Sequence, residues 1–379
     1  MSDDGTDGDA DAGADAAESR GDGADDPRLA AVVAKERSQV AIESLRAEGV
    51  YDADRSVREW DEETVAVPVT APPAETRARR IVRQVGEPRL RTLEDHLAEM
   101  GWTDDELADA PGSWAVLGTV ILVDVGGAPR PAEVGEALLA THGAADTVLA
   151  RGGISGAHRE PDVEVIAGVG DTETVHREHG TEYAMDLAEV MFSPGNKTER
   201  ALMGEVVEDG ETVVDMFAGI GYFTLPMART GAAVTAVERN PTAFQYLLEN
   251  VRRNGVSDRV QPYRADCRDV LEQTGAATDV TADRVVMGYY EASEPRSEDS
   301  RSPSDASYEY LDSALGALRP DGVVHLHEAT PEALVFDRPI DRLRDAAAER
   351  DRSVEVLDTR RVKGYSEGVA HVVVDARIE

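Results

Sequence analysis

The residues at 215–223 and an acid that follows them have the types and spacing of a nucleoside-binding site. The run is Asp-Met-Phe-Ala-Gly-Ile-Gly-Tyr-Phe, and Glu238 stands 17 residues after Gly221. Thr212–Met216 predicts a buried strand that leads into a glycine-rich turn and a helix, and Val234–Val237 predicts a second buried strand that ends at Glu238. Glycines let the backbone approach a ligand, and an acid at a strand end accepts hydrogen bonds from ribose hydroxyls.

The spacing of the glycines indicates which nucleotide is bound. The usual G-x-G-x-x-G is absent, because Gly219 and Gly221 are not followed by a third glycine. Without a cradle for a diphosphate, the turn fits a nucleoside such as S-adenosylmethionine better than NAD. The alternative reading is an ordinary tight turn between a strand and a helix.

The remaining strand ends supply further candidates, since ligands of open α/β sheets lie off the carboxyl ends of the strands. Asp215 and Phe217 end the first strand. Asp266 and Cys267 end the third, where the carboxylate could accept from an adenine amine and the Cys267 N–H could also bind. Asp266 could instead cap the helix that follows. We interpret Cys267 as a packed residue and not a nucleophile, because no cation or histidine stands beside it in the sequence.

Another candidate segment precedes the first strand. It is the run Phe-Ser-Pro-Gly-Asn-Lys-Thr-Glu-Arg at 192–200. Ser193 and Asn196 could cap a helix, which is the simpler interpretation. We favour a ligand role for Ser193 and Arg200, with Arg200 pairing with the carboxylate of a bound amino-acid group.

The elements that must position these residues alternate between strand and helix from residue 191 to 379. Seven strands are predicted, at Thr212–Met216, Val234–Val237, Val260–Tyr263, Arg284–Gly288, Val323–His327, Val354–Arg361 and His371–Ala376. Five helices are predicted, at Thr198–Val207, Phe223–Arg229, Pro241–Asn254, Tyr308–Leu318 and Pro339–Arg350. Alternation predicts an α/β fold with a doubly wound, Rossmann-like parallel sheet, and the last two strands should add an antiparallel edge. Residues 291–307 are expected to form a flexible insertion.

The N-terminal half predicts smaller α+β modules. Residues 1–27 form an acidic tail that is too polar to fold. A small module is expected at 28–75, with a helix at Leu29–Glu48 and a strand at Thr64–Val69, and an α+β domain at 76–190. In that domain Ala115–Val123 predicts one strand, and residues 163–167 and 174–179 a hairpin.

The charge of the chain indicates habitat more than function. The formal net charge is −36, from 75 acids against 39 bases, and only ten of the acids lie in residues 1–26. Acidity spread along the chain suggests a halophilic archaeon, because molar salt shortens the Debye length to about 3 Å and screens the repulsion between carboxylates. The same salt weakens phosphate contacts, so the lack of a basic patch does not exclude a nucleic-acid partner.

Several classes of protein are excluded. A single cysteine, Cys267, rules out a disulfide framework and a cluster held by several thiolates. The histidines are scattered, and neither His325 with His327 nor His176 with His179 has the neighbours of a metal site, so no metal is expected. No apolar run approaches the ~18 residues of a membrane span, and the N-terminus does not look like a signal peptide. A soluble, cytoplasmic protein without a membrane partner is therefore expected.

The runs at 192–196, 215–223 and 287–289 resemble those of the archaeal and eukaryotic tRNA aminocarboxypropyltransferases of the wyosine pathway, whose relatives are the tRNA guanine-37 N1-methyltransferases. The resemblance covers about residues 28–379. It implies the class I S-adenosylmethionine-dependent transferase fold and S-adenosylmethionine as co-substrate, bound by residues that match the family's motifs: Ser193, Arg200, Asp215, Phe217, Gly219, Gly221, Glu238, Asp266 and Cys267. It also implies a monomer that acts on the anticodon loop of tRNA(Phe).

Three departures separate the two branches of the resemblance. The N1-methyltransferases generally have Arg where this chain has Gly195, Pro where it has Tyr222, and an Asn-x-Pro element where it has Met287-Gly288-Tyr289. We therefore expect transfer of an aminocarboxypropyl group to C7 of 4-demethylwyosine at position 37, with Tyr222, Tyr289 or Tyr290 stacking on the base or else packing in the core. Two alternatives stay open: a guanine-37 N1-methyltransferase and a non-catalytic RNA-binding protein.

Overall fold

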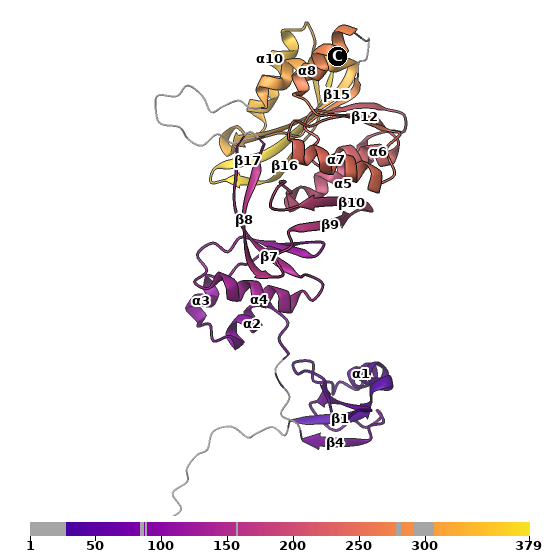
Figure 1. Ribbon diagram of the computed structural model, residues 1–379, viewed down its shortest axis with the longest axis vertical. Helices are drawn as coiled ribbons and strands as arrows, with labels where there is room; N and C mark the ends of the chain where they lie inside the picture. The colour runs from indigo at the N-terminus through magenta and orange to yellow at the C-terminus, as the bar shows by residue number, and fades with distance from the viewer. Residues whose placement is uncertain (1–27, 84–86, 88, 157, 278–281, 291–306) are drawn as a thin grey trace, which may run out of the picture. The chain divides into compact units, whose positions relative to one another are not determined.

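The computed structural model describes residues 28–83, 87, 89–156, 158–277, 282–290 and 307–379 (Figure 1). The chain divides into two compact units, with the boundary between Arg91 and Thr92. The predicted acidic tail and nearly all of the predicted insertion at 291–307 lie outside the described residues. The predicted boundaries at 75 and 190 stay predictions.

The N-terminal unit is a small antiparallel sheet with one helix. Its strand order is β2-β3-β1-β4. Its core is formed by alternate side chains of β1 and β3 and by two positions of α1, namely Ala31, Val33, Val67, Val69, Ala41 and Leu45. The elements are β1 (Leu29–Ala34), η1 (Lys35–Arg37), α1 (Ser38–Ala47), β2 (Arg58–Glu59), β3 (Thr64–Val69) and β4 (Arg80–Arg83).

The second unit begins with a four-stranded sheet in the order β5-β6-β7-β8, followed by the separate hairpin β9–β10. Helices α2 and α4 pack on the sheet through residues such as Leu97 and Leu138, which contact Ile121 and Val148 of the same core. The elements are α2 (Leu93–Glu99), α3 (Asp104–Ala108), β5 (Trp114–Leu117), β6 (Val120–Val123), α4 (Pro131–Thr141), β7 (Thr147–Ser155), β8 (Glu160–Gly168), β9 (Glu173–Glu178) and β10 (Thr181–Asp186).

A seven-stranded sheet forms the rest of this unit, in the order β13-β12-β11-β14-β15-β17-β16. Strands β11 to β15 pair in parallel, and β17 runs antiparallel to both of its neighbours. The strands are β11 (Thr212–Asp215), β12 (Ala233–Val237), β13 (Val260–Tyr263), β14 (Ala282–Met287), β15 (Leu318–Pro331), β16 (Val354–Ser366) and β17 (Val369–Ile378). The predicted Rossmann-like sheet with an antiparallel edge is confirmed.

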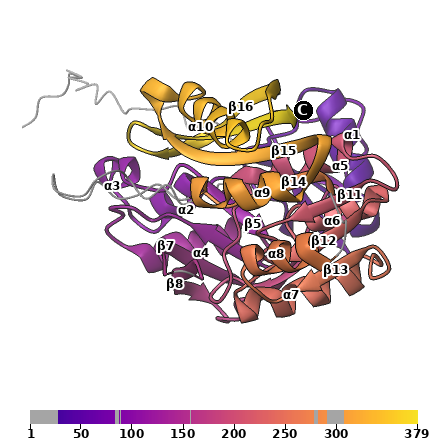
Figure 2. The same ribbon diagram turned by 90° about the horizontal axis from the view of Figure 1, so that it is seen from above.

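Two layers of helices cover this sheet, which explains why β11, β12 and β14 carry apolar side chains on both faces. Helices α5, α6 and α7 share one core with the sheet. Helices α8, α9 and α10 share another, and Figure 2 shows them as a row across the sheet. The helical elements are η2 (Pro194–Asn196), α5 (Lys197–Val206), α6 (Thr224–Thr230), α7 (Pro241–Arg253), α8 (Cys267–Ala277), η3 (Tyr308–Tyr310), α9 (Leu311–Ala317), η4 (Glu332–Leu334) and α10 (Asp337–Ala348).

Three local predictions in the N-terminal half are wrong. Leu29–Ala34 is a strand and not the start of a helix, because pairing with β3 buries it on both faces. Ala115–Val123 is split by a turn at Gly118 into the antiparallel pair β5 and β6. The predicted hairpin of residues 163–167 with 174–179 does not form, since β8 pairs with β7 and β9 pairs with β10.

None of the helices within the described ranges is long and apolar enough to cross a membrane. The reversal of strand order falls between β11 and β14, since β12 follows β11 on one side and β14 pairs on the other. In open α/β sheets such a reversal opens a crevice at the carboxyl ends of the strands. The fold therefore places a binding site where the sequence motif ends.

Candidate active site

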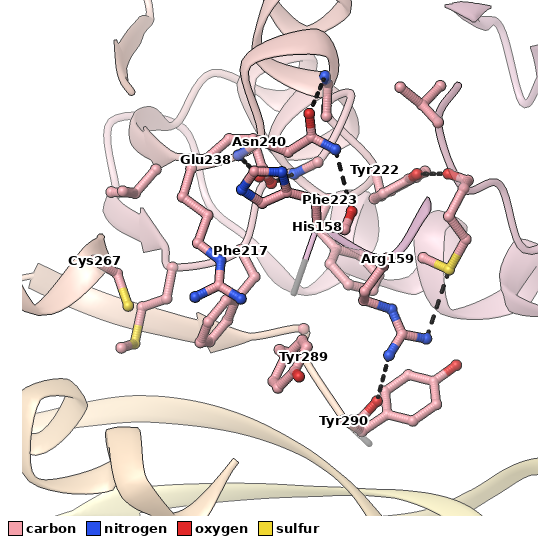
Figure 3. A pocket seen from close by; sticks show the side chains of 18 of the residues that line it. His158, Arg159, Phe217, Tyr222, Phe223, Glu238, Asn240, Cys267, Tyr289 and Tyr290 are labelled. Carbon is pink, nitrogen blue, oxygen red and sulfur yellow. Dashed lines mark hydrogen bonds between the residues drawn. The ribbon is translucent and has the colours of Figure 1, made fainter. Parts of the chain in front are cut away.

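A pocket lies at the carboxyl ends of β11, β12 and β14 and at the start of α8 (Figure 3). Ten of the predicted site residues line it: Ser193, Arg200, Phe217, Gly219, Tyr222, Glu238, Asp266, Cys267, Tyr289 and Tyr290. Two others, Asp215 and Gly221, do not. The structure therefore brings together most of the side chains that the sequence selected, from segments as far apart as residues 193 and 290.

Glu238 connects two parts of the pocket wall. One carboxylate oxygen accepts from the Gly219 N–H at 2.8 Å, and the other accepts from the Asn240 N–H at 2.7 Å. Burial raises the pKa of Glu238 above its ordinary value, and these backbone donors oppose the shift. Each oxygen keeps a further lone pair, so the carboxylate can accept from ligand hydroxyls while it holds the loop.

The glycines of the turn are required by space and by backbone conformation. Gly219 has φ +56°, and a Cβ there would lie 2.2 Å from the ring of Tyr222. Gly221 has φ +103°, and a Cβ there would lie 2.8 Å from Leu225. Of the two, Gly219 lines the pocket, whereas Gly221 serves the turn and the close packing of α6.

Asp215 lies behind the pocket wall. Its carboxylate is fully buried and accepts from the Thr224 hydroxyl at 2.7 Å and from the Phe217 N–H at 3.3 Å. Burial raises the pKa of Asp215 to about 6, and these two hydrogen bonds oppose the shift. Asp215 therefore holds the turn to α6, and its predicted contact with the ligand stays a prediction.

Asp266 and Cys267 occupy the start of α8. Asp266 accepts from the backbone N–H of Arg268 at 3.0 Å, as a helix cap does, and from its guanidinium at 2.8 and 2.9 Å. The guanidinium is the main reason that the pKa of Asp266 is lowered. Cys267 is buried, and burial raises the pKa of its thiol to about 12, which is consistent with a packed residue. Both residues still line the pocket.

Arg200 lines the pocket and has partners within the protein. Its guanidinium is buried and donates to both oxygens of Glu178, at 2.7 and 2.9 Å, and to the Ser193 carbonyl at 2.9 Å. Burial opposes ionisation of Glu178, but hydrogen bonds from His176 and Arg200 outweigh it and lower the pKa of Glu178 to about 2. The charge of Arg200 is therefore neutralised within the protein, and its bond to the Ser193 carbonyl fixes the segment that carries Ser193; its predicted pairing with a ligand carboxylate stays a prediction.

Aromatic rings form another side of the pocket. Phe217 lies 5.2 Å from Tyr289 and 5.0 Å from Tyr310, measured between ring centroids. Tyr290 stacks on His371 at 3.6 Å, so one face of its ring is already covered. The Tyr222 hydroxyl donates to the Met191 carbonyl, which fixes that ring. Of the three predicted stacking residues, Tyr290 is buried, whereas Tyr222 and Tyr289 are both partly exposed.

The sequence prediction missed a loop that reaches the pocket from the four-stranded sheet. His158 and Arg159, between β7 and β8, line the pocket with Asn240. The Asn240 side chain caps α7 by accepting from the Thr242 N–H at 2.9 Å and donates to the His158 carbonyl at 3.1 Å (Figure 3). Asn240-Pro241 is a recognisable helix start that could have been found, but no motif marks His158 or Arg159.

The pocket has the features of a nucleoside site. Among the described residues no group of three histidine, cysteine or acidic side chains could hold a metal ion. An acid with free lone pairs, a flat aromatic wall and a close backbone approach at Gly219 suit a ribose and a purine.

Two family models match the chain, and together they span most of the second unit. The TRM5/TYW2 methyltransferase domain matches residues 174–357, and the TYW2 N-terminal domain matches residues 93–172. These two matches meet where the hairpin β9–β10 begins.

Three known proteins show the extent of the similarity. A tRNA(Phe) (4-demethylwyosine(37)-C(7)) aminocarboxypropyltransferase of Methanocaldococcus jannaschii is 40% identical over 60% of this chain and 83% of its own length. The tRNA (guanine(37)-N(1))-methyltransferase Trm5b of Pyrococcus abyssi is 31% identical over 71% of this chain and 75% of its own. The crystal structure of P. horikoshii TYW2 in complex with MeSAdo is 31% identical, covers 75% of this chain and 97% of its own, and superposes with a TM-score of 0.61.

Proposed function

This chain belongs to the TRM5/TYW2 family, and we propose that it transfers the 3-amino-3-carboxypropyl group of S-adenosylmethionine to C7 of 4-demethylwyosine at position 37 of tRNA(Phe). The observation that carries this proposal is the 40% identity to a protein of that name over 83% of its length. The pocket of this chain supports it, because its residues suit an adenosine. The substrate is a tRNA. We further propose that the protein binds the anticodon loop of this tRNA, that it acts as a monomer and that it needs no metal ion.

S-adenosylmethionine supplies an activated carbon, Cγ. Attack of C7 on Cγ forms a carbon–carbon bond, and the Cγ–S bond breaks with its electron pair passing to sulfur. Methylthioadenosine then leaves, and the proton on C7 is released. The protein has to select Cγ over the methyl group. It does so by placing one carbon in line with the nucleophile at about 3–3.5 Å.

Each part of the wall has a proposed task in this positioning. Glu238 accepts from the ribose hydroxyls, Phe217 lies against the adenine, and Asp266 with the Cys267 N–H binds its polar edge. The two bonds that Glu238 already accepts keep it fixed before a ligand arrives, so little ordering is required on binding.

Tyr289 is the proposed stacking residue for the extruded base. Its ring centroid is 5.2 Å from that of Phe217 and 5.7 Å from the central carbon of the Arg159 guanidinium. Stacking of a base on an aromatic ring contributes about 1–3 kcal/mol. Such a contact keeps its strength in high salt, where phosphate contacts weaken, and this suits an enzyme of the cytoplasm of a halophilic cell.

Labelled co-substrate tests the reaction directly. Wild-type enzyme is incubated in molar salt with tRNA that carries 4-demethylwyosine and with S-adenosylmethionine labelled either at the carboxyl carbon or at the methyl carbon. Carboxyl label in the tRNA, with methyl label left in methylthioadenosine, supports the proposal.

The second candidate is N1-methylation of guanine-37, which the 31% identity to Trm5b favours. It predicts the opposite outcome, with methyl label in a tRNA that carries unmodified guanine and no carboxyl label. A protein that transfers neither label and shows no thermal shift with S-adenosylmethionine would contradict both.

A further inference from the structure

Ser193 is the pocket residue whose hydroxyl has an unusual partner. Lys363, on β16, donates to Ser193 Oγ at 2.7 Å across 170 positions of sequence. With the oxygen accepting from an ammonium, the hydroxyl proton must be donated elsewhere. Its nearest recorded acceptor, Asn196 Oδ1, is 3.4 Å away, which is long for an O–H donor. The proton of Ser193 is therefore available to a ligand in the pocket.

The surroundings of Lys363 are cationic in a strongly acidic chain. Burial is the main cause that lowers the pKa of Lys363 to about 8, and the charges of Arg151, Arg159 and Arg200 add to it. No carboxylate forms an ion pair with Lys363 within the part of the chain that the structure describes. Like charges held together are unfavourable unless an anion joins them. Of these cations, Arg200 is neutralised by Glu178 and Arg151 pairs with Asp124. Lys363 and Arg159 form no ion pair within the described residues, so an anionic group of a ligand beside Ser193 would compensate them.

Gly195 provides the room for this arrangement. A Cβ at this position would lie 3.4 Å from Cδ and 3.8 Å from Nζ of Lys363, and no other atom outside the neighbouring residues would lie within 4 Å. A longer side chain at 195 would extend into the space that Lys363 occupies. The glycine of the Ser-Pro-Gly sequence thus leaves space for Lys363, from a distant strand, to contact Ser193.

Arg159 places a further cation in the same region of the pocket. Its guanidinium contacts the sulfur of Met191, two residues before Ser193, at 3.7 Å and the Tyr290 carbonyl at 3.3 Å. Figure 3 shows this guanidinium well apart from Glu238. Cations therefore lie in two parts of the pocket, since Arg239 lines it next to Glu238 and Arg159 lies nearer to Ser193.

We propose that Ser193 Oγ donates a hydrogen bond to the carboxylate of the aminocarboxypropyl group, and that Lys363 is the positioning residue that orients Ser193 and supplies the charge. The proposal rests on the proposed function. Fixing the carboxylate restricts rotation of the chain that leads to Cγ, so the same contact determines which carbon faces the base.

The experiment compares three ligands that share the adenosine. Calorimetry in molar salt measures binding of S-adenosylmethionine, of its decarboxylated form and of methylthioadenosine to wild type, Lys363→Met and Ser193→Ala. We expect both variants to lose about ten-fold or more in affinity for S-adenosylmethionine, the size of a lost hydrogen bond to a charged group. Affinities for the other two ligands should stay within about two-fold of wild type, because neither has the carboxylate.

Arg361→Gln is the matched control. It removes a positive charge from the same strand, but Arg361 is exposed and pairs with Glu332, so all three affinities should be kept. Equal losses for S-adenosylmethionine and methylthioadenosine in Lys363→Met, or no loss for either, would overturn the inference. Because calorimetry involves no tRNA, that failure is distinct from a failure of the proposed function, which only the label experiment detects.

Discussion

The carboxylate of Glu238 accepts a hydrogen bond from the backbone N–H of Gly219 at 2.8 Å. The acid at the end of β12 is therefore fixed by the glycine turn that follows β11, and the two halves of the sequence motif form one unit. A change at either residue should disturb both the loop and the ligand.

Glu238→Gln should weaken binding of S-adenosylmethionine and of methylthioadenosine to the same degree. Both carboxylate oxygens accept from backbone N–H groups, so an amide would turn its NH₂ toward one of these donors. The uncharged amide is also a weaker acceptor for the ribose hydroxyls, and loss of a hydrogen bond to a charged group costs about 1.5–3 kcal/mol, roughly ten- to hundred-fold in affinity. Calorimetry measures it. Glu249→Gln, which alters a surface pair of α7, is the control, and unchanged affinity in Glu238→Gln would contradict the ribose role.

Gly219→Ala should destabilise the protein more than Gly210→Ala. Both glycines have positive φ, +56° and +83°, but a Cβ at 219 would lie 2.2 Å from Tyr222, whereas at 210 nothing lies within 4 Å. Gly210→Ala should therefore lose only the stability that backbone strain costs, about 1–2 kcal/mol. Gly219→Ala should lose a further ~1–3 kcal/mol because its methyl group is overpacked against Tyr222. Denaturant unfolding of both variants measures the difference. Equal losses would show that Tyr222 moves aside freely.

The sequence predicted the sheet and the glycine turn because their signals are local. Buried parallel strands are short apolar runs, and a positive φ requires glycine, so Thr212–Met216 and Gly219 are visible in a few residues. Leu29–Ala34 was misassigned because a short apolar run has no period that separates strand from helix. Lys363 and Arg159 could not be found, since Lys363 bonds to Ser193 across 170 positions, Arg159 reaches the pocket from the turn between β7 and β8, and neither belongs to a motif.

Arg200 shows a further limit of sequence reasoning. An arginine one turn into a helix beside a ligand segment predicts an anion contact, yet the nearest anion is the protein's own Glu178, 22 residues earlier on β9. The sequence gives no sign of this ion pair, because Glu178 comes close to Arg200 only once the hairpin β9–β10 has formed.

The stability difference between wild type and Asp215→Asn should depend on pH. The pKa of Asp215 is raised from 3.8 to about 6 by burial. A raised folded-state pKa means that its stabilising contribution is complete below pH 3.8 and is lost as the pH rises through about 6. Over this range wild type should lose about 3 kcal/mol relative to the variant, which does not titrate. Unfolding in urea at several pH values measures the difference, and a constant difference would contradict the shift.

The pair of Arg200 and Glu178 should show strong coupling. Removing one partner of a buried pair leaves an uncompensated charge and costs about 3–5 kcal/mol, so Arg200→Met alone should be severely destabilised. In the double variant Arg200→Met with Glu178→Leu no charge remains, and the loss of stability should be much smaller than the sum of the single losses. Because Arg200 is already neutralised, the double variant should keep the wild-type ratio of affinities for S-adenosylmethionine and methylthioadenosine. If the ratio of the two affinities instead falls to about one in a stably folded double variant, Arg200 binds the ligand carboxylate and Glu178 only orients Arg200.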